Sequence, residues 1–297
     1  MLLFWVFFVR VYHIAGKTSL ELGGPRDSSL VIAGRNFFQR TVLKNPDFAQ
    51  KNAKIGWVSD IHADRFKRRT VDSGTIYPRQ YQDYLPKVFD DLRSKGIDTV
   101  VATGDNTNSG DDNYARELSK IAQEKSMHVI WVRGNHDNDK VMNVLDGKKA
   151  RYYYVDYGKT RIVAIDDVEV GGGYQGFIDS EQLAWLRGVL KTDKQVIVAM
   201  HIPIFDGGDA LNSNHVLQSG NFTNMGNILA SYVEFEKVLH ESGNVKMVLS
   251  GHWHVPWQKQ YDGIAYYGQA ALTREGYAGS YGVIDLKSDQ VEYLFAK

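Results

Sequence analysis

Five apolar, β-branched runs along the chain each lead into residues of the types that bind metal ions. Apolar runs of this length, bounded by polar residues or glycine, predict buried β-strands. Open α/β sheets build their binding sites at the carboxyl ends of their strands. The pattern therefore predicts an α/β scaffold that directs several imidazoles and carboxylates toward one place. The runs are KIGWVSD, DTVVATGD, HVIWVRGN, QVIVAMH and VKMVLSGH, and their clusters are Asp60-Ile61-His62, Gly104-Asp105-Asn106, Gly134-Asn135-His136-Asp137, His201 and Gly251-His252-Trp253-His254.

The composition fits an enzyme domain and narrows the kinds of site that the chain can form. Its 297 residues, 43% of them apolar, are enough for one large core with a short extension. The formal net charge is zero, so there is no general attraction for nucleic acid or for an acidic membrane. Cysteine is absent, which excludes disulfides and thiolate ligands. Any metal ion must therefore be held by nitrogen and oxygen atoms.

Residues 1–16 form a separate hydrophobic segment, in which residues 1–9 are wholly apolar and are followed by Arg10. The apolar stretch is shorter than the roughly 20 residues that a helix needs to span a bilayer. Its length suits the apolar region of a signal peptide, but no basic residue precedes it. Three interpretations stay open: a clipped or mis-started membrane anchor, which we favour, a signal peptide, and a helix packed on the globular domain. We expect membrane association or an extracytoplasmic location, with the cytoplasm as the alternative.

Strand and helix patterns alternate along a single predicted domain at 54–297, which follows an extension at 17–53. Beyond the fifth cluster the pattern changes to successive short strands. This order predicts an α/β fold in which two β-sheets pack face to face with helices outside. The expected helices are 81–92, 112–125, one that begins at Asp179 with Gln182 completing a capping box, and 227–242; the expected strands besides the five runs are 29–34, 160–167, 263–272, 280–287 and 290–297.

The types and number of the candidate ligands indicate a centre of two metal ions. Strand side chains alternate, so Asp60 and His62 can approach one cation together, as can His252 and His254. One catalytic ion normally takes three protein ligands and water, whereas a larger set suits two ions, roughly 3.5–4 Å apart, that share Asp105. Imidazole and oxygen ligands suit divalent or mixed-valence transition metals, with Mn, Fe or Zn expected. The seven candidate ligands are Asp60, His62, Asp105, Asn135, His201, His252 and His254.

The ordered series D-x-H, G-D-N, G-N-H-D, H and G-H-x-H resembles the calcineurin-like metallophosphoesterase superfamily. Each block alone is a weak signal, but five in this order are specific. The resemblance implies a four-layer αββα sandwich of two mixed β-sheets flanked by helices. It also implies that His136 faces the substrate and assists the leaving group, with Asp137 holding its orientation. The implied ligands are Asp60, His62, Asp105 and His254 for one metal ion, and Asp105, Asn135, His201 and His252 for the other.

Differences between this chain and two subfamilies indicate which branch of the superfamily it resembles. Protein Ser/Thr phosphatases carry an Asp-Arg-Gly extension after the second block, and this chain lacks it. Purple acid phosphatases have a tyrosine ligand where this chain has Asn108, and they lack the histidine that is His62 here. The series therefore resembles the phosphodiesterase-like branch.

The sequence predicts a dinuclear phosphoesterase in which a metal-bridging hydroxide attacks phosphorus, acting on phosphodiesters or phosphomonoesters of small substrates. A nuclease is the alternative, but it needs a basic, aromatic-lined groove. Only one short basic run, at 65–69, is present, and we interpret it as a solvated loop or the start of a helix, with a contact to the substrate phosphate as the alternative because the run begins three residues beyond His62. A non-catalytic metal- or phosphate-binding module would lack a ligand or His136, and none is missing. Residues 206–226 are the predicted substrate-facing loop, whereas Asp166 and Asp167 are interpreted as structural.

Overall fold

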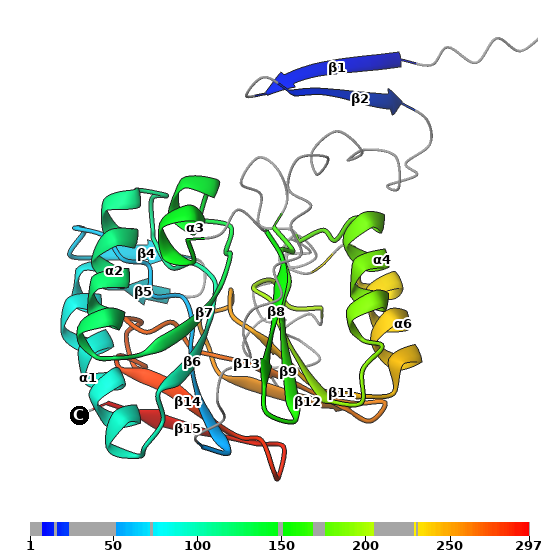
Figure 1. Ribbon diagram of the computed structural model, residues 1–297. Coiled ribbons are helices and arrows are strands. Elements are labelled where there is room, and N and C mark those ends of the chain that lie inside the picture. Colours follow the sequence, from blue (N-terminus) through cyan, green and yellow to red (C-terminus); the bar gives the residue numbers. More distant parts are fainter. Residues whose placement is uncertain are drawn as a thin grey trace, which may run out of the picture.

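The computed structural model describes residues 8–14, 17–23, 52–71, 74–147, 151–168, 176–204, 229 and 231–296. Most of these residues belong to two β-sheets and the helices that cover them (Figure 1). The expected strand at 29–34 and the expected substrate-facing loop at 206–226 lie outside the described residues.

One sheet has five strands in the order β15-β14-β3-β6-β7. Strands β3, β6 and β7 run parallel to one another, whereas β14 and β15 are antiparallel to their neighbours. Parallel neighbours place their carboxyl ends at one edge of the sheet, and this brings the first three clusters together. The bounds are β3 Lys54–Val58, β6 Thr99–Thr103, β7 His128–Val132, β14 Ser280–Asp285 and β15 Gln290–Phe295.

The other sheet has six strands in the order β12-β13-β11-β10-β9-β8. Its four inner strands are parallel, and the edge strands β12 and β8 are antiparallel to their neighbours. Strands β10 and β11 carry the fourth and fifth clusters. The bounds are β8 Tyr153–Tyr157, β9 Thr160–Ala164, β10 Gln195–Ala199, β11 Val245–Ser250, β12 Trp257–Tyr261 and β13 Ile264–Gly268.

The two sheets face each other, and helices cover their outer faces (Figure 1). Trp57 and Val101 of one sheet share a buried cluster with Met247 and Leu249 of the other. A second cluster lies under α1 Tyr81–Ser94, α2 Asp112–Glu124 and α3 Asp139–Leu145, and a third under α4 Ser180–Val189 and α6 Tyr232–Ser242. The predicted αββα sandwich of two mixed sheets is therefore confirmed.

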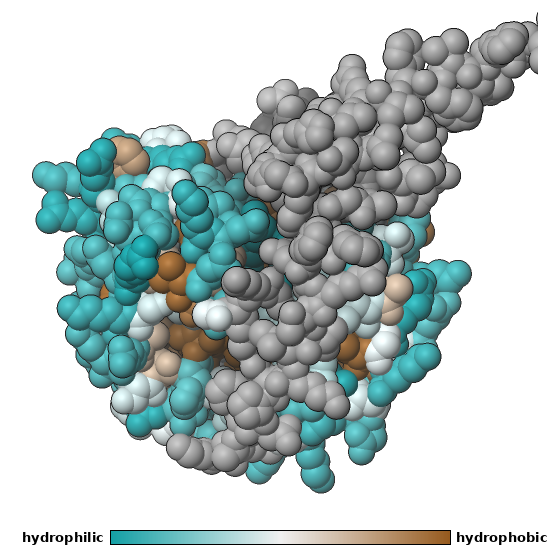
Figure 2. Space-filling view, turned by 45° about the horizontal axis from the view of Figure 1, so that its top comes forward, coloured by the Kyte–Doolittle hydropathy of each residue, from teal (hydrophilic) through white to brown (hydrophobic). Residues whose placement is uncertain are grey.

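The helices are amphipathic, which explains how they cover the sheets. In α1 the buried positions Leu85, Val88 and Leu92 form one apolar stripe, as helical spacing requires. Hydrophilic residues dominate the outer surface on the side of α1, α2 and α3 (left of Figure 2). Of the two hydrogen bonds of the predicted capping box at α4, one forms: the Asp179 side chain accepts from the Gln182 N–H. The Gln182 side chain does not return to Asp179 but bonds to the main chain of Asp166.

Several elements were not predicted from the sequence, because their apolar patterns are short. They include α3, β8, β12 and the hairpin of β4 Arg69–Val71 and β5 Gly74–Ile76, which lies beyond the first cluster. A short 3-10 turn, η2 Pro78–Gln80, connects this hairpin to α1. The hairpin fixes the loop that follows the first cluster.

Near the amino terminus, strands β1 Phe8–Ile14 and β2 Lys17–Gly23 form an antiparallel hairpin. Within the segment 1–16, the described residues 8–14 therefore form a strand and not the packed helix that was one of the three interpretations. Among the described residues, no helix is both long and apolar enough to cross a membrane.

Candidate metal centre

All five clusters stand directly after the carboxyl ends of their strands. Asp60 follows β3, Asp105 follows β6, and Asn135 follows β7 in one sheet. In the other sheet, His201 follows β10 and His252 follows β11. The clusters meet because the sheets pack face to face with these strand ends at the same edge.

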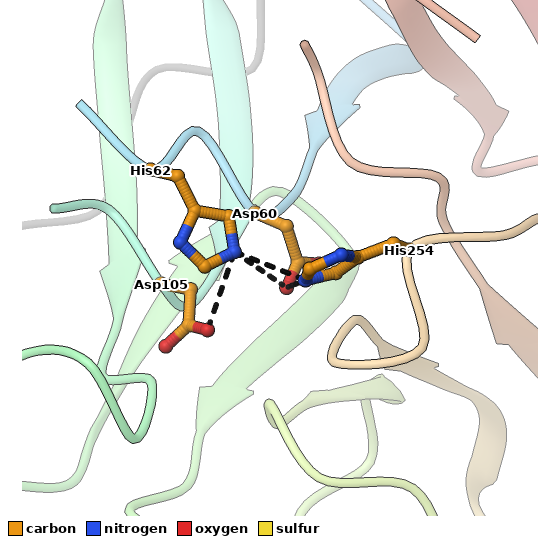
Figure 3. Close-up of side chains that lie close together, drawn as sticks. All are labelled: Asp60, His62, Asp105 and His254. Atoms are coloured by element: carbon orange, nitrogen blue, oxygen red, sulfur yellow. Dashed lines mark hydrogen bonds and ion pairs between the residues drawn. The ribbon is translucent and has the colours of Figure 1, made fainter. Parts of the chain in front are cut away.

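The first group of ligand atoms comes from Asp60, His62, Asp105 and His254, which are all buried (Figure 3). One ligand atom from each residue lies within 4.8 Å of all the others. His62 Nε2 lies 3.0 Å from His254 Nε2 and 3.5 Å from Asp105 Oδ2. His254 Nε2 lies 3.3 Å from Asp60 Oδ1. These four residues are those that the resemblance implied for one metal ion.

The second group of ligand atoms surrounds His201 Nε2. Asn135 Oδ1 lies 3.0 Å from this nitrogen, His252 Nδ1 lies 3.2 Å from it, and Asp105 Oδ1 lies 3.4 Å from it. The other ring nitrogen, His201 Nδ1, lies 2.8 Å from the carbonyl oxygen of Thr103. Metal-binding histidines commonly donate their second ring N–H in this way, which fixes the ring orientation. These residues are those that the resemblance implied for the other ion.

Asp105 connects the two groups through its two carboxylate oxygens. Oδ2 faces His62 of the first group, and Oδ1 faces His201 of the second. The N–H of His136 donates to Oδ1 at 2.8 Å, which fixes the rotation of the carboxylate. The side chain is therefore oriented as a ligand shared by two ions would be.

The backbone around the ligands is unusual, because five candidate ligands have positive φ angles. The angle is 49° at Asp60, His62 and Asp105, 71° at His252 and 60° at His254. Non-glycine residues in this region carry a cost of about 1–3 kcal/mol each and cluster at functional sites. Main-chain hydrogen bonds hold the conformation: Asp60 N–H donates to Gly104 O at 3.1 Å, and His62 N–H donates to Asp105 O at 2.8 Å.

Glycines in three of the clusters allow the ligand loops to approach one another. A Cβ atom on Gly251 would lie 2.4 Å from Asp60 Oδ2, and one on Gly104 would lie 2.5 Å from His201 Nδ1. A Cβ atom on Gly134 would lie 2.0 Å from the main-chain nitrogen of Asp105. The glycines are therefore required by close packing around the ligands.

Replacement of Gly134 by alanine is expected to damage the centre, because the main chain of Asp105 cannot move without displacing its carboxylate. We expect a loss of stability of about 1–3 kcal/mol, as for other overpacked sites, and a loss of bound metal. Thermal unfolding and elemental analysis measure both effects. Gly188→Ala in α4 is the matched control, since nothing lies within 4 Å of its Cβ position. Equal metal content in the two variants would contradict the prediction.

The charges in the centre are unbalanced without a cation. Burial alone would raise the pKa values of Asp60 and Asp105, but the surrounding histidines lower both below their usual range. Burial alone would lower the pKa of His201, but Asp105 raises it to about 10. Burial, followed by the charge of His201, lowers the pKa of His252 to about 3. Burial also lowers the pKa of His62, so the rings of His62 and His252 do not balance the charge of the buried carboxylates.

A bound cation would resolve this imbalance. Among the described residues, no lysine or arginine forms an ion pair with Asp60 or Asp105, whose ion-pair partners are histidines. Buried charges are normally paired or coordinate metals. Imidazole nitrogens that face each other at 3.0 Å also fit coordination to a shared ion better than contact with each other. The donor set therefore fits transition-metal ions.

His136 lies beside the candidate ligands, but Asp137 does not contact its ring as the resemblance implied. His136 Nε2 lies 4.0 Å from Asp105 Oδ2, and Nδ1 lies 2.7 Å from the carbonyl oxygen of Asn108. The Asp137 carboxylate instead accepts hydrogen bonds from Asn106, Thr107 and the N–H of Gly134. The Asp137 carboxylate therefore joins the second and third clusters, and the carbonyl oxygen of Asn108 is the group that contacts the His136 ring.

Two carboxylates that are not candidate ligands support the centre: Asp167, which was interpreted from the sequence as structural, and Asp64, which was not predicted. Asp167 accepts hydrogen bonds from the main-chain N–H groups of His201 and Ile202, and burial raises its pKa to about 7. Asp64 accepts from the Asn108 side chain. The sequence signal for Asp167 was its place at the end of a strand, but its partner is 34 residues away. No pattern in the chain could reveal that pairing.

Comparisons with known proteins agree with this geometry. A family model described as calcineurin-like phosphoesterase matches residues 53–256. A Fibrobacter succinogenes protein named probable cyclic nucleotide phosphodiesterase is 23% identical over 69% of this chain and 74% of its own length. A Nostoc protein named 3′,5′-cyclic-nucleotide phosphodiesterase is 24% identical over 61% of this chain and 65% of its own length. The fold is similar to that of a dimetal phosphatase from Danio rerio, with a TM-score of 0.61, 15% identity, and coverage of 82% of this chain and 99% of the other.

Proposed function

Because this chain belongs to the calcineurin-like phosphoesterase family and is a metal-dependent phosphoric ester hydrolase, we propose that it hydrolyses small phosphodiesters at a dinuclear centre. One ion would be held by Asp60, His62, Asp105 and His254, and the other by Asp105, Asn135, His201 and His252. The ions are Mn, Fe or Zn, which suit imidazole and oxygen ligands.

The orientation of Asp105 is the observation that carries the dinuclear proposal. Its two oxygens face His62 and His201, which belong to different groups of ligand atoms, at 3.5 and 3.4 Å. A mononuclear centre would leave the imidazole and amide donors of the second group without a function. Two ions use both groups.

Each side chain of the centre has a different role in hydrolysis. When bound, two ions supply Lewis acidity and an activated water, and they neutralise charge that develops at phosphorus. The Asn135 amide lies beside His201 and stabilises the charged oxygens of the phosphoryl group. His136 is partly exposed beside the ligand atoms, with Nε2 4.0 Å from Asp105 Oδ2, and gives a proton to the leaving oxygen. Asp105 fixes the positions of the two groups of ligand atoms relative to each other.

Cyclic nucleotides are the first substrates to test, because two relatives carry names of cyclic nucleotide phosphodiesterases. A panel of 3′,5′-cyclic AMP, cyclic GMP, bis-p-nitrophenyl phosphate and p-nitrophenyl phosphate, assayed with Mn²⁺, distinguishes diesters from monoesters. We expect the diesters to be hydrolysed at a higher kcat/KM than the monoester. Preferential hydrolysis of the monoester would overturn the phosphodiesterase assignment and leave the dinuclear centre in place.

Removal of the metal ions is expected to destabilise the folded protein, because the buried carboxylates lose their counter-ions. A ligand at 100 times its Kd stabilises the native state by about 2.7 kcal/mol, so a chelator should lower the free energy of unfolding by at least this order. Thermal unfolding with and without EDTA measures the loss, and added Mn²⁺ or Zn²⁺ should reverse it. An unchanged melting temperature would count against resident ions at this centre.

A further inference from the structure

Asn108 bonds to its neighbours through all of its polar groups, although it is not one of the candidate ligands. Its main-chain carbonyl oxygen lies 2.7 Å from His136 Nδ1, and its N–H donates to the carbonyl oxygen of Ala63 at 3.2 Å. Its Nδ2 donates to Asp64 Oδ2 at 3.1 Å, and its Oδ1 accepts a hydrogen bond from the guanidinium of Arg69. Asn108 therefore connects the loop after the first cluster to the ring of His136.

The partners of the side-chain amide fix its orientation. A guanidinium can only donate hydrogen bonds and an ionised carboxylate can only accept them. The amide oxygen of Asn108 must therefore face Arg69, and the amide nitrogen must face Asp64. The reverse orientation would place donor against donor and acceptor against acceptor. Asn108 and Asp64 are only 5% and 3% exposed, so water cannot easily replace either bond.

Asp64 and Arg69 are themselves anchored. Asp64 Oδ1 accepts from the N–H of Arg65 at 2.6 Å and from the N–H of Phe66 at 3.4 Å, which closes the turn after the first cluster. Arg69 begins β4, which pairs with β5. The two residues therefore hold Asn108 from opposite ends of one loop. We call Asp64, Arg69 and Asn108 the clamp.

We propose that Asp64 and Arg69 are positioning residues for His136, and that they act through Asn108. This inference rests on the proton-donating role proposed above for His136. A carbonyl oxygen only accepts, so the clamp holds the proton of the His136 ring at Nδ1 and turns Nε2 toward the candidate metal centre. When the ring is protonated, the proton on Nε2 passes to the leaving oxygen as the P–O bond breaks, and the ring becomes neutral.

This role has a kinetic signature that a general effect on folding does not have. Protonation matters most for a leaving oxygen that is a strong base, and it matters little for p-nitrophenolate, which leaves without help. A ring in the wrong position should therefore make kcat depend more steeply on the acidity of the leaving group. Loss of stability or of metal would lower kcat for all leaving groups alike.

The test uses Arg69→Met in the full chain and a series of methyl aryl phosphodiesters whose phenols differ in acidity. We expect kcat to fall about tenfold for the least acidic phenol and less than about threefold for p-nitrophenol, a part of the 10²–10⁴ typical of general acid catalysis. KM and metal content should stay unchanged, and Arg69→Lys should recover part of the loss. Arg68→Met is the matched control: Arg68 is exposed on the same loop, and its replacement removes the same charge.

Two further variants separate the possible outcomes. Asp64→Asn keeps the size of the side chain but offers one acceptor to two donors, so it should give the same steeper dependence. In the His136→Ala background, Arg69→Met should cause no further loss. An additional loss there, an equal loss for all phenols, or an equal effect of Arg68→Met would overturn the clamp. If kcat of His136→Ala depends on the acidity of the leaving group no more steeply than kcat of the unchanged protein, the proposed role of His136 fails, and the clamp fails with it.

Discussion

Replacement of Asp105 by asparagine is expected to abolish activity and to remove both metal ions. The carboxylate is buried between the two groups of ligand atoms, with one oxygen toward His62 and the other toward His201. An amide of the same shape offers one neutral oxygen and turns two donors toward imidazoles or cations. Loss of residues that only support ligands already costs about 10–100-fold in metal affinity, so loss of a shared ligand should cost more than about 100-fold.

Elemental analysis and activity at a series of metal concentrations measure this effect. Asp98→Asn is the matched control, because Asp98 stands next to the opposite end of the same strand, β6, and is also buried. That variant should keep its metal content. Retention of two tightly bound ions by Asp105→Asn would contradict the shared ligand. Retention of one ion would show that the groups bind independently.

Replacement of His136 by alanine is expected to lower kcat by about 10²–10⁴, the usual contribution of general acid catalysis. Metal content should stay the same, because His136 Nε2 lies 4.0 Å from Asp105 Oδ2 and Nδ1 faces the Asn108 carbonyl oxygen, so the ring meets the ligand His62 only edge-on, at 5.0 Å between ring centroids. The main-chain N–H that supports Asp105 is kept in the variant. Turnover should therefore fall while the centre stays intact.

Steady-state kinetics with metal analysis of the same preparation tests this prediction. His128→Ala provides a matched control, since His128 is an exposed histidine at the start of β7, the strand that leads to His136. If His136→Ala lost its ions, the residue would be a ligand rather than a proton donor. If kcat stayed within a factor of about three, general acid catalysis by this group would be excluded.

Much of the fold was predictable, because the apolar runs are long and each is bounded by a clear change of composition. The five strands that lead into the clusters and the helix at 81–92 followed from periodicity. The hairpin of β4 and β5 did not, because its strands have three residues each and little apolar pattern. The two-sheet arrangement followed from the order of the elements.

The contacts of Asp137 and Asn108 could not be predicted from the sequence. Asp137 stands next to His136 in the chain, and this adjacency suggested an orienting role. Its carboxylate is turned to the second cluster, and a carbonyl oxygen 28 residues away faces the ring instead. Main-chain acceptors leave no trace in composition or spacing, so only the packed loops identify them.

The sequence by itself determined the identity of the candidate ligands, their order, and the strands that carry them, because residue types and strand periodicity are local properties. Only the tertiary structure decided that Asp105 faces two groups of donors and that Asp64 and Arg69 hold Asn108. These facts depend on contacts between loops from separate strands. The direction of a side chain there is set by φ angles and neighbours that lie far away in the chain.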